Sequence, residues 1–161
     1  MKKLDYECEL AVVLGRDARD VPAGQTRDYI FGYTILNDVS ARDVQTAHKQ
    51  WYFGKSLDGF TPIGPCIVTA DAFADYPPRL GIRSFVNGEK RQDSNTALQI
   101  FDIDHVIAEL SQGMTLKAGT IIATGTPAGV GMGMDPPQFL KPGDVVRCEI
   151  EGIGTLTNPV K

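Results

Sequence analysis

Apolar residues occur along the chain in short runs rich in valine, isoleucine and threonine, and glycine, proline, asparagine or aspartate separates one run from the next. This pattern is typical of a protein built mainly from β-strands. The turn pair Asn87-Gly88 is the strongest hairpin signal, and it predicts that 89–92 pairs back on the strand before it. Strands are predicted over 6–14, 33–36, 63–69, 82–86, 120–124, 145–150 and 155–157.

Helical patterns are fewer and shorter. The segment 22–30 is predicted to be helical because its proline lies in the first turn, where proline is favoured. Ser40 followed by Asp43 resembles a capping box and predicts a second helix from Ala41 to about His48.

A third helix is predicted from its periodicity. It begins after Asp102 or Asp104 and ends at Gly113. One apolar face, which should cover a sheet, contains Ile103, Val106, Ile107 and Leu110. The predicted fold class is therefore α+β, mainly β with short helices.

Length and composition indicate one globular domain over residues 1–161, with 42% apolar and 22% charged residues. No stretch approaches the roughly 20 consecutive apolar residues of a membrane span, and the first residues lack the apolar core of a signal peptide. We therefore expect a cytoplasmic protein with no membrane partner. The net charge is −4 and the basic residues are scattered, which argues against a nucleic-acid partner.

Three cysteines, Cys8, Cys66 and Cys148, lie far apart beside apolar residues. Their odd number and their spacing favour buried reduced thiols over a disulfide framework or a zinc site. We expect a reducing compartment.

Two glutamates separated by one residue, Glu7 and Glu9, lie on a predicted strand. Because side chains alternate between the faces of a strand, both carboxylates project from the same side, about 7 Å apart. Asp38 follows another predicted strand and precedes a predicted helix, a place where functional carboxylates are common. Three such carboxylates suit a hard cation such as Mg²⁺, Mn²⁺ or Ca²⁺. A solvent-facing strand edge is the alternative for Glu7 and Glu9 alone.

Few other side chains suit catalysis. Lys55 lies in an aromatic run, 51–56, that a glycine interrupts, and such a run can hold an ammonium group in a partly desolvated pocket. A surface lysine is the alternative. His105 is expected on the exposed side of the third helix, whereas His48 is either a helix-end imidazole or a catalytic base. No Ser-His-Asp or Cys-His set is supported.

The segment 124–133 is rich in glycine and follows a predicted strand. Small residues let backbone amides approach an anion closely. The segment lacks the lysine of a Walker loop and the spacing of a dinucleotide loop. A carboxylate-sized ligand therefore fits better than a nucleotide, and a plain turn is the alternative.

Together these segments resemble the catalytic C-terminal domain of the fumarylacetoacetate hydrolase family. The resemblance runs nearly from end to end, and six blocks follow one another in the family's order. They are 5–15 (DYECELAVVLG), 32–45 (GYTILNDVSARDVQ), 54–58 (GKSLD), 62–65 (PIGP), 110–115 (LSQGMT) and 123–131 (ATGTPAGVG).

The resemblance implies a rolled mixed β-sandwich that forms a homodimer. It implies that the three carboxylates Glu7, Glu9 and Asp38 bind Mg²⁺ or Mn²⁺, which agrees with the ligand chemistry above. It also gives roles to four further residues. Gln45, Lys55 and Thr126 would hold the substrate's oxygens, and Arg42 would steady Asp38 or another carboxylate.

The implied chemistry is that of an enolate formed from a 2-keto acid or an acylpyruvate-type diacid, of the kind produced in aromatic catabolism. C–C hydrolysis, decarboxylation and isomerisation all remain open, and Lys55 would add positive charge beside the enolate. Family members usually carry an upstream segment whose lid supplies a His or Glu, whereas only 1–4 precede the acidic strand here. This favours isomerase or decarboxylase activity over hydrolysis. The alternative is a catalytically silent dimeric module that binds metal and ligand.

Overall fold

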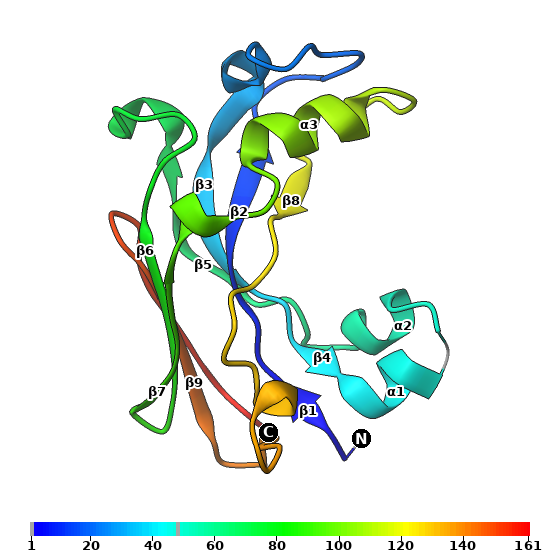
Figure 1. Cartoon of the computed structure of the whole chain (residues 1–161), viewed down its shortest axis with the longest axis vertical. Coiled ribbons are helices and arrows are strands. Elements are labelled where there is room, and N and C mark those ends of the chain that lie inside the picture. The colour runs from blue at the N-terminus through cyan, green and yellow to red at the C-terminus, as the bar shows by residue number, and fades with distance from the viewer. Residues whose placement is uncertain (1, 48) are drawn as a thin grey trace.

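The structure is a computed structural model that describes residues 2–47 and 49–161. Strands predominate and the helices are short (Figure 1). The strands are β1 (Leu4–Asp5), β2 (Cys8–Leu14), β3 (Ile30–Asn37), β4 (Ser40–Ala41), β5 (Ile63–Thr69), β6 (Gly81–Val86), β7 (Glu89–Asn95), β8 (Ile121–Ala123), β9 (Val145–Ile150) and β10 (Gly154–Pro159). The α-helices are α1 (Arg42–Ala47), α2 (Tyr52–Lys55) and α3 (Ile103–Ser111), and the 3₁₀-helices are Thr26–Tyr29, Ala70–Ala72, Thr96–Leu98 and Gly131–Gly133. The predicted class, mainly β with short helices, is confirmed.

Two four-stranded sheets form the body of the molecule, in the orders β5-β3-β2-β8 and β10-β9-β6-β7. A two-stranded ribbon of β1 and β4 lies beside them. Figure 1 shows the two sheets as facing layers, with α3 across one end and the pair α1 and α2 standing to one side. All strand pairings between the described residues are antiparallel. The expected mixture of parallel and antiparallel strands is therefore not found among these residues.

Strand β2 is buried along its whole length and determines where the acidic residues point. Its alternate residues Cys8, Leu10, Val12 and Leu14 belong to the hydrophobic core between the sheets. Because faces alternate along a strand, Glu9 lies on the opposite face, and Glu7 continues that parity just before the strand begins. The burial of the apolar face thus sets the direction of both carboxylates.

Two predicted helical features are wrong. Within the predicted helix 22–30, only Thr26–Tyr29 is helical, as a 3₁₀ turn. Gly24 has a φ of 84°, and contacts of Gly24 and Thr26 with Asp104 on α3 replace helical bonding there. The predicted capping box also fails, because the Ser40 hydroxyl donates to the carbonyl of Asp38 and accepts from Lys55.

The third helix and its histidine follow the prediction more closely. Asp102 caps α3 by accepting from the N–H of His105. The His105 side chain is exposed and stacks on Phe101, with ring centroids 4.7 Å apart. Leu110 departs from the expected apolar face, since it is 36% exposed. His48, for which a catalytic base was one interpretation, lies outside the described residues.

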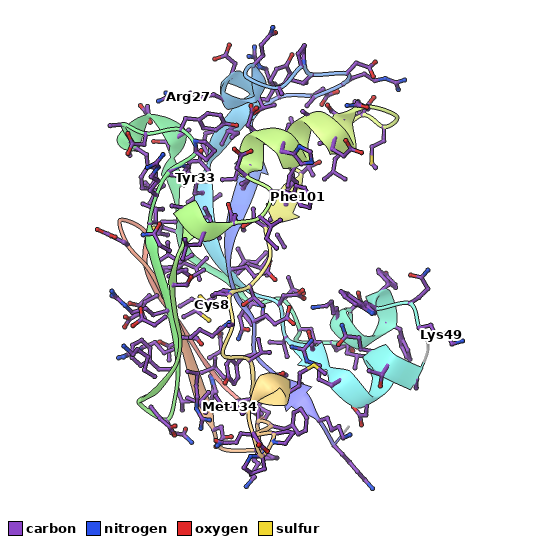
Figure 2. The ribbon with its side chains drawn as sticks, viewed as in Figure 1. Cys8, Arg27, Tyr33, Lys49, Phe101 and Met134 are labelled. Atoms are coloured by element: carbon purple, nitrogen blue, oxygen red, sulfur yellow. The ribbon has the colours of Figure 1, made fainter. Side chains whose placement is uncertain are left out.

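The cysteines are free thiols, but only two of them are buried. The thiols of Cys8 and Cys148 form a hydrogen bond between the sheets. This bond, together with burial, raises the pKa of the Cys8 thiol. Figure 2 shows Cys8 among the side chains that fill the space between the layers. Cys66 is exposed on β5, so its expected burial is wrong.

No helix among the described residues has the length and apolar character to cross a bilayer.

Candidate metal and substrate site

Three carboxylates meet where β2 begins and β3 ends. Glu7, Glu9 and Asp38 each offer an oxygen, and these oxygens all lie within 4.8 Å of one another. The backbone N–H of Asp38 donates to the carbonyl of Glu7 at 2.9 Å, which fixes the end of β3 against the start of β2. The structure therefore brings the three predicted residues together.

The ammonium group of Lys55 lies directly on this carboxylate cluster. Its Nζ is 2.9 Å from Oε2 of Glu7, 2.5 Å from Oδ2 of Asp38 and 2.9 Å from Oγ of Ser40. Burial alone would lower the pKa of Lys55, but the hydrogen bonds and charges of Asp38 and Glu7 outweigh burial and raise it. Lys55 therefore stays protonated.

The aromatic run around Lys55 does not form the expected pocket wall. Trp51, Tyr52 and Phe53 are 64%, 78% and 51% exposed, whereas the Lys55 side chain is 19% exposed. The glycine of the run has a clear role instead. A Cβ on Gly54 would lie 2.7 Å from the backbone nitrogen of Gln45, so glycine is needed for α2 to pack on α1. This packing delivers Lys55 to the carboxylates.

Arg42 steadies a carboxylate other than Asp38. Its guanidinium bridges Asp5, with Nε 2.9 Å from Oδ2, and Glu7, with Nη2 2.6 Å from Oε1. Its Nη1 also donates to Oε1 of Gln45 at 3.1 Å. Burial opposes the charge on Arg42, but Glu7 and Asp5 together raise its pKa. Arg42 thus fixes one oxygen of Glu7 and the orientation of the Gln45 amide.

Glu9 is held from the other side by the glycine-rich segment. The N–H of Gly125 donates to Oε2 of Glu9 at 2.7 Å. Burial, reinforced by the charges of Asp38 and Glu7, raises the pKa of Glu9 to about 7, and the Gly125 hydrogen bond only partly offsets this. Burial of the carboxyl is thus the main cause of the elevated pKa, and repulsion from the neighbouring carboxylates adds to it.

The glycine-rich segment binds anions, but those it binds here belong to the protein. Gly125 holds Glu9, while the N–H groups of Gly131 and Met132 hold the fully buried Asp5. Figure 1 shows this segment running from β8 along β2 toward β1. The expectation of an external anion thus needs revision for these three amides.

Two of the hydrogen-bond donors around the site have no acceptor among the described residues. One is the backbone N–H of Thr126, whose hydroxyl already donates to the Cys8 carbonyl and accepts from Gln92. The other is the amide nitrogen of Gln45, whose oxygen is turned toward Arg42. Both residues were predicted to hold substrate oxygens, and each retains a donor for that purpose.

The charges of the site fit a divalent cation. Four carboxylates (Asp5, Glu7, Glu9 and Asp38) are joined by the contacts above to two cationic side chains (Arg42 and Lys55), which leaves a net charge of −2 when all are ionised. Ligand oxygens around Mg²⁺ lie about 2.1 Å from the ion, hence at most about 4.2 Å apart. A small contraction of the cluster would reach that geometry.

Sequence reasoning missed Asp5, Ser40 and Gln92, which all contact the predicted residues. Asp5 stands at the start of the acidic block, yet its partners are 37 and 126 residues away. Such long-range pairs leave no local spacing signal. Burial of these polar side chains indicates their role, but burial is known only from the structure and not from the sequence.

Comparisons with known proteins agree with the resemblance. YisK, an oxaloacetate tautomerase of Bacillus subtilis (strain 168), is 49% identical over 158 residues, which are 98% of this chain and 52% of that protein. A fumarylacetoacetate hydrolase from Exiguobacterium antarcticum has a TM-score of 0.97 at 52% identity and covers 100% of this chain and 57% of its own. A 2-hydroxyhepta-2,4-diene-1,7-dioate isomerase from Mycobacterium marinum has a TM-score of 0.88 at 46% identity, over 99% of this chain and 59% of its own.

The present chain therefore spans about half the length of the curated relatives it matches. The family profile described as "Fumarylacetoacetate (FAA) hydrolase C-terminal" matches residues 1–161. The chain belongs to the fumarylacetoacetate hydrolase family, as its C-terminal domain.

Proposed function

We propose that this chain is the catalytic domain of a divalent-metal-dependent enzyme that enolises 2-keto acids, with Mg²⁺ or Mn²⁺ held by Glu7, Glu9 and Asp38. The observation that carries the proposal is the convergence of these three carboxylates within 4.8 Å, beside the protonated Lys55. A bare acidic cluster would repel itself, and the net charge of −2 is what one divalent ion neutralises.

The relatives support a 2-keto acid or a related diacid as the substrate class. Oxaloacetate is a 2-keto diacid, and 2-hydroxyhepta-2,4-diene-1,7-dioate is the enol form of another; both names belong to proteins that are at least 46% identical to this chain. Interconversion of either compound with its tautomer passes through an enolate. Stabilisation of an enolate is therefore the task we assign to the site. Isomerisation passes through the enolate, whereas in hydrolysis and decarboxylation the cleavage of the C–C bond itself produces it.

The residues of the chain then have distinct tasks. Lys55 supplies an ammonium charge beside the oxygen on which the enolate charge develops, in a part-buried site where such a charge acts strongly. The free donors on Thr126 and Gln45 would hold the substrate's carboxylate oxygens. Arg42 keeps Glu7 in place and so preserves the ligand geometry. When bound, the cation would polarise the 1-carboxylate and 2-oxo oxygens and favour the enolate.

A product screen tests this function. The EDTA-treated chain is mixed with Mg²⁺ and with oxaloacetate, acylpyruvates or hydroxymuconate-type diacids, and products are followed by mass spectrometry and by the absorbance of the enol. We expect Mg²⁺-dependent turnover of at least one 2-keto acid, and a rise in Tm with ligand only when Mg²⁺ is present. Ligand-dependent stabilisation without any turnover would instead support the silent binding module.

We also propose that the chain forms a homodimer through an uncharged apolar surface. Leu98, Ile100 and Phe101 are 74%, 93% and 61% exposed, which is unusual for neighbouring apolar side chains. They border a cavity of about 450 Å³ whose lining, completed by α3 and the segment after β8, contains no charged residue. Figure 2 shows Phe101 just before α3.

Because each copy carries a net charge of −4, two copies repel each other least where they meet through an uncharged face. Protruding apolar groups next to a cavity also suit a self-complementary interface between identical chains. Light scattering should report a dimer for the wild type and a monomer for Ile100→Lys. A monomeric wild type would overturn the proposal.

A further inference from the structure

We propose that Gln92 is a positioning residue for the site: its amide ties the segment 124–127 to β2, and so sets the places of the Thr126 N–H and of the Gly125 N–H that holds Glu9. Gln92 lies on β7, in the sheet opposite the carboxylates, and it is 0% exposed. The effect on ligand binding rests on the proposed function, whereas the effect on the segment does not.

Every hydrogen-bonding position of the Gln92 amide is used. Its Oε1 accepts from the N–H of Cys8 at 3.1 Å and from the hydroxyl of Ser84 at 2.8 Å. Its Nε2 donates to the hydroxyl of Thr126 at 2.7 Å and to the carbonyl of Pro127 at 2.8 Å. An amide offers two acceptor and two donor positions, so this side chain is fully satisfied.

The orientation of the amide is fixed by backbone groups that cannot change role. If the amide were flipped, Nε2 would face the Cys8 N–H and Oε1 would face the Pro127 carbonyl. Both contacts would then be repulsive, so Oε1 must point to β2 and Nε2 to the segment. Gln92 is therefore a directional link between two defined backbone positions.

Both ends of this link join parts of the candidate site. Cys8 is flanked by Glu7 and Glu9, so its N–H lies in the stretch of β2 that sets the two carboxylates. Thr126 follows Gly125, and its hydroxyl also donates to the Cys8 carbonyl at 2.9 Å. Because Gln92 donates to the Thr126 hydroxyl, the proton of that hydroxyl points to the Cys8 carbonyl. The backbone N–H of Thr126 is then the donor that remains available to a ligand.

A purely structural core position would favour an apolar side chain here. Burying an amide costs free energy unless all its hydrogen bonds form. The four bonds of Gln92 meet this condition, but two of them are made to a segment without regular secondary structure, residues 124–127. The arrangement uses a buried polar group to hold a loop, which is what positioning of a ligand-binding segment requires.

The test compares Gln92→Leu with Ser84→Ala in the full chain. Leucine removes all four hydrogen bonds at similar volume. Ser84 is equally buried, is paired with Gln92 in the β6–β7 register, and donates to the same oxygen. Its hydroxyl hydrogen-bonds to neither Thr126 nor Pro127. Ser84→Ala is therefore a control for loss of a core hydrogen bond.

Two measurements are made on each variant. Hydrogen exchange of peptides covering 124–128 is followed in the ligand-free protein. Binding of oxalate, whose oxygens copy those of an enolised 2-keto acid, is measured by calorimetry with Mg²⁺. For Gln92→Leu we expect about tenfold faster exchange at Gly125 and about tenfold weaker oxalate binding. For Ser84→Ala we expect a lower Tm with both quantities within about twofold of the wild type.

A Gln92→Leu variant that loses stability but keeps wild-type exchange over 124–128 would overturn the proposal, and so would faster exchange with unchanged oxalate affinity. If the wild type binds no oxalate in the presence of Mg²⁺, the proposed function fails, and the exchange measurement alone decides whether Gln92 holds the segment. If Gln92→Leu does not fold, Gln92→Glu replaces it. That variant keeps the acceptor for Cys8 and Ser84 and loses the donors to Thr126 and Pro127, so the same two changes are expected.

Discussion

The ammonium nitrogen of Lys55 lies 2.5 Å from a carboxylate oxygen of Asp38, although the two residues come from separate elements. Lys55 ends α2, and Asp38 immediately follows β3. In the metal-free chain this pair supplies part of the charge balance that the acidic cluster needs. The same ammonium group is placed to act on a ligand bound to the cluster.

Lys55→Met tests that role, since it keeps the length of the side chain and removes the charge. We expect kcat to fall on the order of a hundredfold, which is typical for one electrostatic contact to a developing negative charge. Mg²⁺ affinity should not fall, because no carboxylate is lost. Steady-state kinetics and calorimetry measure the two quantities, and near-normal kcat would leave the cation as the sole electrophile.

Asp38→Ala should abolish the rise in Tm caused by Mg²⁺ as well as Mg²⁺-dependent turnover. Because Lys55 retains Glu7 as a partner, and because one of three crowded negative charges is removed, the Tm in EDTA should stay level or rise. The exposed Asp58 provides a control, Asp58→Ala, which should respond to Mg²⁺ like the wild type. Equal losses of Tm and activity in EDTA would identify Asp38 as a structural carboxylate.

Glu9 should make the stability of the metal-free chain depend on pH. The pKa of its carboxyl is about 7 when folded, against the ordinary value of 4.5 expected for the unfolded chain. Between these values the folded state keeps a proton that the unfolded state has lost, so the free energy of unfolding decreases as the pH rises from 4.5 to 7. A shift of this size corresponds to roughly 3 kcal/mol.

Glu9→Gln removes the titrating group and retains an oxygen that accepts from Gly125. In EDTA, the free energy of unfolding of the wild type should fall relative to that of Glu9→Gln as the pH rises from 4.5 to 7. Above this range the difference between the two proteins should be constant. Urea denaturation at a series of pH values measures this difference. Parallel curves for the two proteins would rule out the elevated pKa.

Gly54→Ala should damage the site without removing any of its polar side chains. The new Cβ would meet the backbone of Gln45, with 2.7 Å to its nitrogen, and would push α2 away from α1. We expect a loss of about 1–3 kcal/mol in stability and a lower kcat through displacement of Lys55. Gly133→Ala is the control, because the nearest contact of its Cβ, a methyl group of Val130, is 3.8 Å away. Crystal structures or melting curves that show no difference between the two variants would contradict this account.

Two local signals predicted the structure around them correctly. The hairpin at Asn87-Gly88 forms because both residues adopt the positive φ that such a turn requires, 52° and 85°. Glu7 and Glu9 converge with Asp38 because alternation along a buried strand fixes their common side. In both cases the information lies within a few neighbouring residues.

Contacts between distant segments could not be predicted in this way. The anions bound by the glycine-rich segment are Glu9 and Asp5, which are 116 and 126 residues from their partners Gly125 and Gly131. Likewise, the aromatic neighbours of Lys55 suggested its surroundings, but its contacts are with Glu7, Asp38 and Ser40. Periodicity shows which side chains share a face, and it does not show what lies opposite that face.

The central claim is that the carboxylate cluster, once loaded with a divalent cation, promotes enolisation of a 2-keto acid. Exchange of the C3 hydrogens of oxaloacetate into D₂O, followed by ¹H NMR, measures this enolisation directly. We predict exchange that depends on the chain and on Mg²⁺ or Mn²⁺, that stops with EDTA, and that Asp38→Ala abolishes. Exchange no faster than in metal-containing buffer without protein would contradict the account.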